Sequence, residues 1–486
     1  MVKNSVMMQA FEWYLPDDGE YYTNMKERIP ELKDSGFDAL WLPPMFKATG
    51  TNDTGYGIYD LYDLGEFDQK GAVRTKYGTL EELRELVDVL HEHDMQVFAD
   101  VVLNHKAGAD ETELFKVIQV DENDRTKEIS DAHNVEGWTK FTFPGRNGKY
   151  SDFEWDFNHF TGIDYDQKND ITGVFKILGD DKHWSDGVSN EKGNYDYLMF
   201  ADIDHKHPAV KDDLFHWGEW FINHVDIDGM RFDALKHIEK NFIKEFVEHI
   251  HDVSDKDLYL FGEYWQEDVE SKSDYLFEME YNLDLFDVGL HYNLCQASND
   301  ADNYDMRKIF DNSLVQNHPT LAVTFVDNHD SQPGQSLESF VEPWFNKIAY
   351  GLILLRKDGY PCVFYGDYYG MGGDNPIEGY KDTIDQLIDI RKRYAYGKQM
   401  DFFESEQLIG FTRHGDEEHP GSLAVVISTG DMTSLRMDVG EDQAGKVYVE
   451  LTGENENEVT IDEDGFGEFE VGPGTLCCWA EKPAEK

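Results

Sequence analysis

Short apolar runs alternate with amphipathic stretches along most of the chain. The runs are rich in aliphatic, β-branched and aromatic residues, which is typical of buried strands. They lie at residues 6–11, 37–42, 97–103, 229–233, 258–261, 285–288, 321–326 and 362–365. Between several of them, stretches such as residues 80–93 and 241–251 repeat apolar side chains at helical spacing. Eight strand–helix units in series predict an α/β fold, a (β/α)8 barrel, whose active site is built at the carboxyl ends of the strands.

Two regions depart from this alternation. The interval between residues 103 and 229 is too long for a single helix and its loops, and it is rich in Gly, Asp, Asn and aromatic residues. It predicts an inserted domain after the third strand, at residues 104–206. After about residue 397, short strands at 423–428, 446–451 and 475–480 follow one another without helices. We therefore expect the barrel at residues 1–103 and 207–396, and a C-terminal antiparallel β-sandwich domain at 397–486.

The composition excludes several classes of protein. No apolar run approaches the roughly 18–20 residues that a membrane span needs. The N-terminus lacks the apolar core and cleavage site of a signal peptide, so we expect a cytoplasmic protein, or a secreted one supplied already trimmed. The four cysteines have no metal-ligand spacing and predict free, mostly buried thiols.

The charge balance is strongly acidic. Asp and Glu number 99 against 43 Lys and Arg, which gives a formal net charge of −56. Such a surface repels nucleic acid and anionic membranes, so neither is an expected partner, whereas a neutral substrate is unaffected. Because the acids are spread along the whole chain, we interpret them as an adaptation to salt or to solubility. We expect a monomer.

Charged residues follow four of the apolar runs. The segments from Asp100 to His105, Gly229 to His237, Phe261 to Trp265 and Phe325 to Asp330 each begin in an apolar run and end in polar chemistry. Three carboxylates, Asp233, Glu263 and Asp330, thus fall at the exits of three different strands. Enzymes that cut glycosidic bonds need carboxylates arranged in this way.

The neighbours of these carboxylates predict different protonation states. Alternate strand residues point to the same side, so the guanidinium of Arg231 should lie beside Asp233 and hold it ionised, as a nucleophile must be. Glu263 lies among aromatic residues, and an apolar setting raises a carboxyl pKa, which suits a general acid. A lone Asp at a strand end is more often a helix cap. Three carboxylates, an Arg and two His in barrel order are hard to explain by structure alone.

These segments resemble the four characteristic sequence regions of the α-amylase family, glycoside hydrolase family 13. The similarity is closest to the bacterial liquefying α-amylases and extends through residues 9–14, 55–66, 194–198 and 325–335. By this resemblance Asp233 is the nucleophile, Glu263 the acid/base and Asp330 the transition-state stabiliser. The implied reaction is endo-hydrolysis of α-1,4-glucosidic bonds in starch, glycogen and maltooligosaccharides with retention, for which two carboxyl groups about 5–5.5 Å apart are expected.

The resemblance also implies which residues bind the glucan. They are His105, Arg231 and His329 at the cleavage point, Tyr56 stacking there, Lys236 and His237 on the leaving-group side, and Trp13, Leu198 and Trp265 along the cleft. His105, His329 and Tyr56 are also plausible from their positions, because all three fall in strand-end segments or loops.

A calcium site follows from the oxygen chemistry of the insert and from the resemblance. Asn104, Asp196 and Asp202 carry the oxygen ligands that hard cations take, and the family adds the backbone carbonyl at His237. The alternative is an acidic loop that is solvated without metal.

The chain departs from the liquefying amylases at other metal positions. Their calcium–sodium–calcium cluster uses acids where this chain has Thr161, Ser185 and Lys206. Their calcium near the C-terminal domain uses a His-Asp pair where this chain has Glu406 and Gln407. We therefore expect one calcium rather than a cluster.

Other functions remain open at this point. A transglycosylase, a maltooligosaccharide-forming amylase or an exo-acting α-glucosidase could use the same barrel. A non-enzymatic glucan-binding relative would typically lose catalytic carboxylates, and this chain keeps all three.

Overall fold

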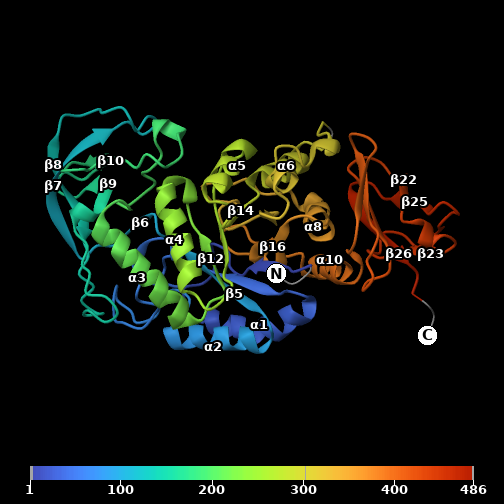
Figure 1. The fold of residues 1–486 in the computed structure, drawn as a ribbon, viewed down its shortest axis with the longest axis horizontal. Coiled ribbons are helices and arrows are strands. Elements are labelled where there is room, and N and C mark those ends of the chain that lie inside the picture. Colours follow the sequence, from blue (N-terminus) through green and yellow to red (C-terminus); the bar gives the residue numbers. More distant parts are fainter. Residues whose placement is uncertain (1–3, 302, 484–486) are drawn as a thin grey trace.

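The computed structural model of the chain describes residues 4–301 and 303–483. Eight parallel strands close into a barrel at the centre of the molecule (Figure 1). They are β1 (Met7–Gln9), β2 (Ala39–Leu42), β5 (Gln96–Val101), β12 (Gly229–Phe232), β13 (Tyr259–Gly262), β14 (Asp284–Phe286), β15 (Ala322–Phe325) and β16 (Tyr360–Phe364). Each lies in one of the eight predicted apolar runs, give or take two residues at its ends, so the predicted barrel is confirmed.

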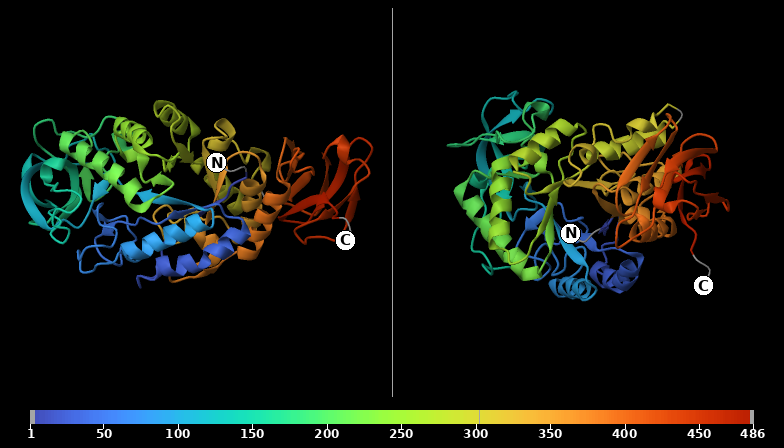
Figure 2. Two further views of the ribbon diagram at one scale, coloured as in Figure 1. Left: turned by 60° about the horizontal axis from the view of Figure 1, so that its bottom comes forward. Right: turned by 45° about the vertical axis from the view of Figure 1, so that its right-hand side comes forward.

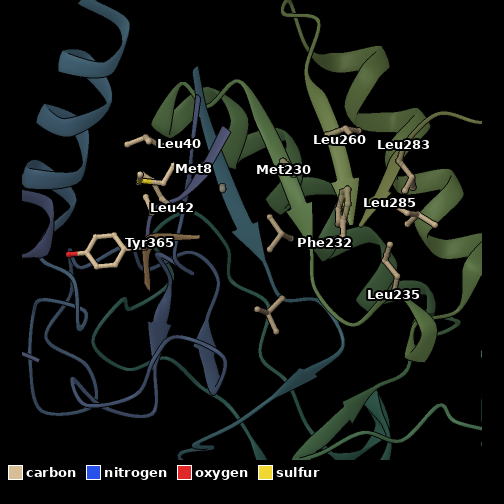
Figure 3. Close-up of a cluster of buried hydrophobic side chains, with 14 of the residues drawn as sticks. Met8, Leu40, Leu42, Met230, Phe232, Leu235, Leu260, Leu283, Leu285 and Tyr365 are labelled. Atoms are coloured by element: carbon tan, nitrogen blue, oxygen red, sulfur yellow. The ribbon is translucent and has the colours of Figure 1, made fainter. Parts of the chain in front are cut away.

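Side chains alternate between the inside of the barrel and the helices around it. On β2, Ala39 and Trp41 belong to the cluster that fills the barrel, whereas Leu40 and Leu42 join the cluster beneath the helices. Figure 3 shows Leu40 and Leu42 with Met230 and Phe232 in this outer layer. Apolar side chains therefore lie on both faces of most barrel strands, which explains why the strands read as nearly continuous apolar runs.

Helices cover the barrel from outside (Figure 2). They are α1 (Tyr21–Ser35), α2 (Leu80–Glu92), α3 (Pro208–Val225), α4 (Lys240–Val253), α5 (Val269–Glu278), α6 (Val288–Asn299), α7 (Leu314–Asn317), α8 (Asn346–Leu355), α9 (Tyr365–Tyr369) and α10 (Lys381–Tyr394). Helix α2 begins with a capping box, in which Thr79 and Glu82 each accept a hydrogen bond from the other's backbone N–H. No helix within the described ranges is long and apolar enough to cross a membrane.

An antiparallel six-stranded sheet is inserted between β5 and β12. Its order is β6-β11-β9-β10-β7-β8. The strands are β6 (His105–Lys106), β7 (Glu111–Val120), β8 (His133–Lys140), β9 (Phe160–Asp166), β10 (Ile171–Ile177) and β11 (Ala201–Ile203). Short pairs β3 (Lys47–Ala48) with β4 (Ile58–Asp60) and β17 (Gly370–Met371) with β18 (Ile377–Glu378) lie in loops after β2 and after β16. Figure 1 shows the inserted sheet at one end of the molecule.

Antiparallel strands form the opposite end of the molecule (Figure 1). They are β19 (Gln399–Phe403), β20 (Leu408–Arg413), β21 (Leu423–Ser428), β22 (Thr433–Asp438), β23 (Val447–Glu450), β24 (Glu458–Thr460), β25 (Phe466–Val471) and β26 (Thr475–Glu481). Strands β22 and β25 pair separately from the six-stranded sheet, and side chains such as Met437, Phe469 and Trp479 share one core. Gly351 of α8 lets β26 approach, since a Cβ there would lie 2.2 Å from Leu476. The expected C-terminal antiparallel β-domain is confirmed.

All four cysteines are free, as the sequence predicted, and three of them are buried.

Candidate active site

The carboxyl ends of β12 and β13 bring Asp233 and Glu263 together. The backbone N–H of Glu263 donates to the carbonyl of Phe232 (2.9 Å), and the N–H of Leu235 donates to the carbonyl of Glu263 (2.9 Å). Directly after Asp233, Ala234 adopts a left-handed conformation (φ 53°, ψ 36°), an unusual choice for a residue with a Cβ. The chain therefore turns sharply at the strand end, and backbone hydrogen bonds fix the two acidic residues relative to each other.

Arg231 is the centre of the charge network. Its Nη1 donates to Asp233 Oδ1 (2.8 Å) and to Asp100 Oδ1 (3.0 Å), and its Nη2 donates to Glu263. The side chain is fully buried, and its guanidinium lies 5.0 Å from the ring centroid of Trp41. The expected contact with Asp233 is present, but the same guanidinium also holds Glu263, which the strand alternation did not predict.

The Glu263 carboxyl is disfavoured as an anion. Burial raises its pKa to about 8, against the lowering effect of Arg231, and the neighbouring carboxylates Asp233 and Asp330 raise it further. The elevated pKa agrees with the expectation from the aromatic residues around Glu263. A carboxylic acid that keeps its proton at neutral pH can donate it to a leaving oxygen.

Asp100 is a further buried carboxylate that the sequence analysis did not assign to the site. Its Oδ2 accepts hydrogen bonds from Trp41 Nε1 (3.0 Å) and from the Tyr56 hydroxyl (2.9 Å). Burial raises its pKa to about 6. The signal in the sequence was an Asp inside the apolar run 97–103, on the strand face that Phe98 shares. Asp100 ties Tyr56 to Arg231 and so fixes the floor of the site.

His329 and Asp330 lie in the loop after β15. Nε2 of His329 lies 3.3 Å from Asp330 Oδ2, while its Nδ1 lies 2.8 Å from the amide nitrogen of Gln9. Burial and the nearby Arg231 hold the His329 pKa well below its usual value, so the imidazole is neutral. Burial also raises the pKa of Asp330 to about 7. Sequence reasoning missed Gln9, which lies 320 residues away along the chain.

Three rings lie parallel beside this loop. Tyr56 stacks against His329 with centroids 5.1 Å apart, and Trp13 lies 6.1 Å from each of them. His105 lies close by, with its Nε2 at 2.9 Å from the carbonyl oxygen of Tyr56, and burial lowers its pKa. The structure thus brings Trp13, Tyr56, His105 and His329 together, and they provide ring faces and imidazole groups at one place.

The remaining predicted cleft residues are Lys236, His237, Trp265 and Leu198. Lys236 Nζ donates to the carbonyl of Trp265 (2.9 Å) and to Glu191 Oε2 (2.7 Å), so Lys236 and Trp265 adjoin each other. His237 is buried, and its Nδ1 lies 2.7 Å from the carbonyl oxygen of Tyr195. Leu198 is half-buried in the loop before β11.

A cavity of about 430 Å³ adjoins the site between the inserted sheet and the loop that carries Thr49. Its wall includes Trp138, Tyr165 and Phe200, and the ring of Phe200 lies 5.4 Å from that of His105. Trp138 is 43% exposed although it lies on a strand. These aromatic residues were not predicted; a Trp at an outward position of β8 was the available signal.

The oxygen atoms expected to hold calcium fit a cation. Asn104 Oδ1 is buried and has no hydrogen-bond partner among the described residues. Burial raises the pKa values of Asp196 and Asp202, and Asp196 raises that of Asp202 further, so the two carboxylates face each other. No group of three or more His, Cys, Asp or Glu side chains in residues 4–301 and 303–483 could hold a metal. A site of two carboxylates with amide and backbone oxygens is compatible with that finding, since Ca²⁺ also takes carbonyl oxygens and water.

The family model for the alpha amylase catalytic domain matches residues 22–416. The chain belongs to the alpha-amylase family. It is 47% identical over 480 residues to an alpha-amylase of Geobacillus stearothermophilus, covering 99% of this chain and 87% of the relative. It is 46% identical over 481 residues to a glucan 1,4-alpha-maltohexaosidase of Bacillus sp. strain 707, covering 99% and 93%.

A solved structure supports the fold independently. The crystal structure of an Anoxybacillus alpha-amylase superposes with a TM-score of 0.67 at 20% identity and covers 99% of both chains. The chain is therefore a glycoside hydrolase of the alpha-amylase family, built on a barrel with an inserted sheet and a C-terminal β-domain.

Proposed function

We propose that this enzyme is an endo-acting α-amylase that hydrolyses α-1,4-glucosidic bonds in starch, glycogen and maltooligosaccharides with retention of configuration. The observation that carries the proposal is the grip of Arg231 on both Asp233 and Glu263. Two carboxyl groups that bond to one guanidinium lie close together, as in a retaining pair, whereas inversion needs a separation of roughly 6.5–9.5 Å.

Each carboxyl group has a distinct role in the proposed mechanism. Asp233 attacks the anomeric carbon, while Glu263 donates its proton to the leaving oxygen. In the second step Glu263, now ionised, takes a proton from a water molecule whose oxygen bonds to the anomeric carbon, while the bond between that carbon and Asp233 breaks. Asp330 accepts hydrogen bonds from sugar hydroxyls as positive charge develops on the ring.

The surrounding residues bind and orient the glucan. Neutral His329 accepts the Gln9 amide N–H at Nδ1, so its Nε2–H can donate to a sugar hydroxyl. The Nε2–H of neutral His105 is used by the Tyr56 carbonyl, so His105 contacts the sugar with its ring. Tyr56 and Trp13 offer ring faces for stacking. Lys236 and His237, near Trp265, bind the leaving-group side, and Leu198 contributes apolar wall. Arg231 is fully buried and acts on the substrate indirectly, because it positions the carboxyl groups of Asp233 and Glu263.

Product length is the finer question. The cavity beside His105 extends the aromatic surface toward the inserted sheet, which supports binding of several glucose units on one side of the cleavage point. A maltooligosaccharide-forming amylase is the second candidate, and the maltohexaosidase relative favours it. A time course of products from amylose separates the two. Random cleavage gives a broad early mixture, whereas a fixed product from the first minutes would favour the second candidate.

We also propose one calcium ion, held by Asn104, Asp196, Asp202 and the carbonyl of His237. When bound, the ion would stabilise the junction between β5, β11 and the loop after β12. The buried, unpartnered oxygen of Asn104 supports this proposal.

We propose domain boundaries at residues 104–206 and 397–486, with the barrel at 1–103 and 207–396, because the inserted and C-terminal sheets fall within these limits. The net charge of −56 disfavours self-association, which supports a monomer.

A further inference from the structure

Three carboxylates crowd the corner where the inserted sheet meets the barrel. Asp196 and Asp202 are 1% exposed, and the side chain of Asp204, two residues beyond Asp202, is 13% exposed. Asp204 lies close enough to interact electrostatically with both other carboxylates. The proposed calcium uses Asp196 and Asp202. Asp204 requires a second positive charge.

Lys182 supplies that charge from within the chain. Its ammonium donates to Asp204 Oδ2 (2.7 Å), to the carbonyl of Phe160 (3.0 Å) and to the carbonyl of Asn158. The side chain is only 7% exposed. The three acceptors come from the turn after β11, the start of β9 and the short helix η1 (Phe157–His159). All three N–H donors of the ammonium are thereby used, and three separate segments are joined at one point.

The acceptors around Lys182 are those that a metal ion would use. One carboxylate and two backbone carbonyls form an oxygen set that suits a hard cation, and an ammonium carries one positive charge to the same place. The position is shielded from water. Removal of the Lys182 ammonium would therefore leave the Asp204 carboxylate buried without a partner of opposite charge.

The neighbouring residues do not fit a cluster of several metal ions. The hydroxyl of Thr161 donates to Asp202, and the backbone N–H of Ser185 donates to Asp196 Oδ2 (2.9 Å). Lys206 adds a further cation, 3.7 Å from the exposed Asp186. Hydrogen-bond donors thus already use one oxygen of Asp202 and one of Asp196, and a further ammonium lies nearby, so few free oxygens remain for additional metal ions.

We propose that Lys182 replaces a metal ion. Its ammonium occupies a set of oxygen ligands that would otherwise bind a divalent cation, so the inserted sheet is stabilised with only one calcium. The inference rests on the proposed calcium only because that ion accounts for Asp196 and Asp202. Catalysis does not enter its test.

The test compares Lys182→Ala with wild type and with Lys176→Ala. Lys176 of β10 also forms an ion pair in the inserted region, but its partner is Glu128 (3.0 Å) and not one of the three carboxylates, so its variant is the matched control. Lys182→Ala should lower the Tm by on the order of 5 °C in low calcium, because a buried carboxylate loses its partner. Calcium added up to about 10 mM, a range that weak sites require, should then restore the Tm of Lys182→Ala more than that of the control. Equilibrium dialysis should find one calcium in wild type and a second, weaker one in Lys182→Ala.

Three results would overturn the proposal. They are two or more tightly bound metal ions in wild type, a Tm of Lys182→Ala equal to that of Lys176→Ala, or a destabilised Lys182→Ala that takes up no additional calcium. The last result would make Lys182 an ordinary ion pair. Wild type without any calcium would instead contradict the proposed calcium site and leave the Lys182→Ala comparison to decide the role of Lys182.

Discussion

Replacing Glu263 by Gln removes the proton that the proposed mechanism delivers to the leaving oxygen while keeping an oxygen for Arg231 to bond. We expect kcat/KM on starch to fall by about 10²–10⁴-fold, the usual contribution of a general acid. In wild type, kcat/KM should fall as pH rises through about 8, where Glu263 loses its proton. The residual activity of Glu263→Gln should lack this alkaline limb.

The same substitution has a consequence for stability. A carboxyl group whose pKa rises on folding favours the native state most at low pH, and this contribution is lost as pH rises through the folded pKa. For Glu263 the pKa rises from 4.5 to about 8. At about 1.4 kcal/mol per pH unit, the upper limit of the loss is about 5 kcal/mol between these pH values. The Tm of Glu263→Gln should therefore decline less between pH 5 and 8 than that of wild type.

An activated substrate separates loss of the acid from loss of the fold. An aryl maltooligoside with a nitrophenolate leaving group needs no proton donor in the first step. Glu263→Gln should release a burst of nitrophenol as the covalent intermediate accumulates, whereas Asp233→Asn should show none, because it lacks the nucleophile. The reasoning is refuted if Glu263→Gln keeps more than a few per cent of starch activity, keeps the alkaline limb, or loses as much on the aryl substrate as on starch.

Three further outcomes are expected. Gln9→Met should lower kcat/KM roughly tenfold, because His329 loses a buried hydrogen bond. The control Gln443→Met removes a buried amide in the C-terminal domain and should change only the Tm. Equal kinetics for the two variants would contradict the role of Gln9. Chelation should lower both Tm and activity, since calcium bound only to the native state stabilises it; a Tm indifferent to chelator would exclude the site. Raising NaCl from 0.05 to 1 M with calcium fixed should raise the Tm, because screening weakens repulsion among the acids; a falling Tm would rule out adaptation to salt.

Local pattern in the sequence was sufficient for the barrel. Most barrel strands carry apolar side chains on both faces, so they appear as short apolar runs, and eight such runs with helices between them leave few other folds. The catalytic carboxylates could be predicted from the sequence for a related reason. Asp233 and Glu263 directly follow strands and Asp330 lies in the loop after β15, and parallel strands deliver their carboxyl ends to one mouth of the barrel. The sequence also predicted the elevated pKa of Glu263 from its aromatic neighbours.

Contacts between distant segments could be decided only by the tertiary structure. Arg231 was expected to pair with Asp233, but the closure of the barrel also places Asp100 and Glu263 within its reach. Gln9 meets His329 because β1 and the loop after β15 approach the same site from opposite ends of the chain.

The carboxylates Asp196, Asp202 and Asp204 show the same limit of prediction from the sequence. The resemblance implied that Thr161, Ser185 and Lys206 take the place of acids, and from this we expect one calcium. It did not indicate that Lys182 brings an ammonium to Asp204 and two carbonyls, since that contact depends on how a loop folds back on β9 and β11. Periodicity reports which side of an element is buried, whereas the partner that a buried charge finds there is set by the packing of the whole fold.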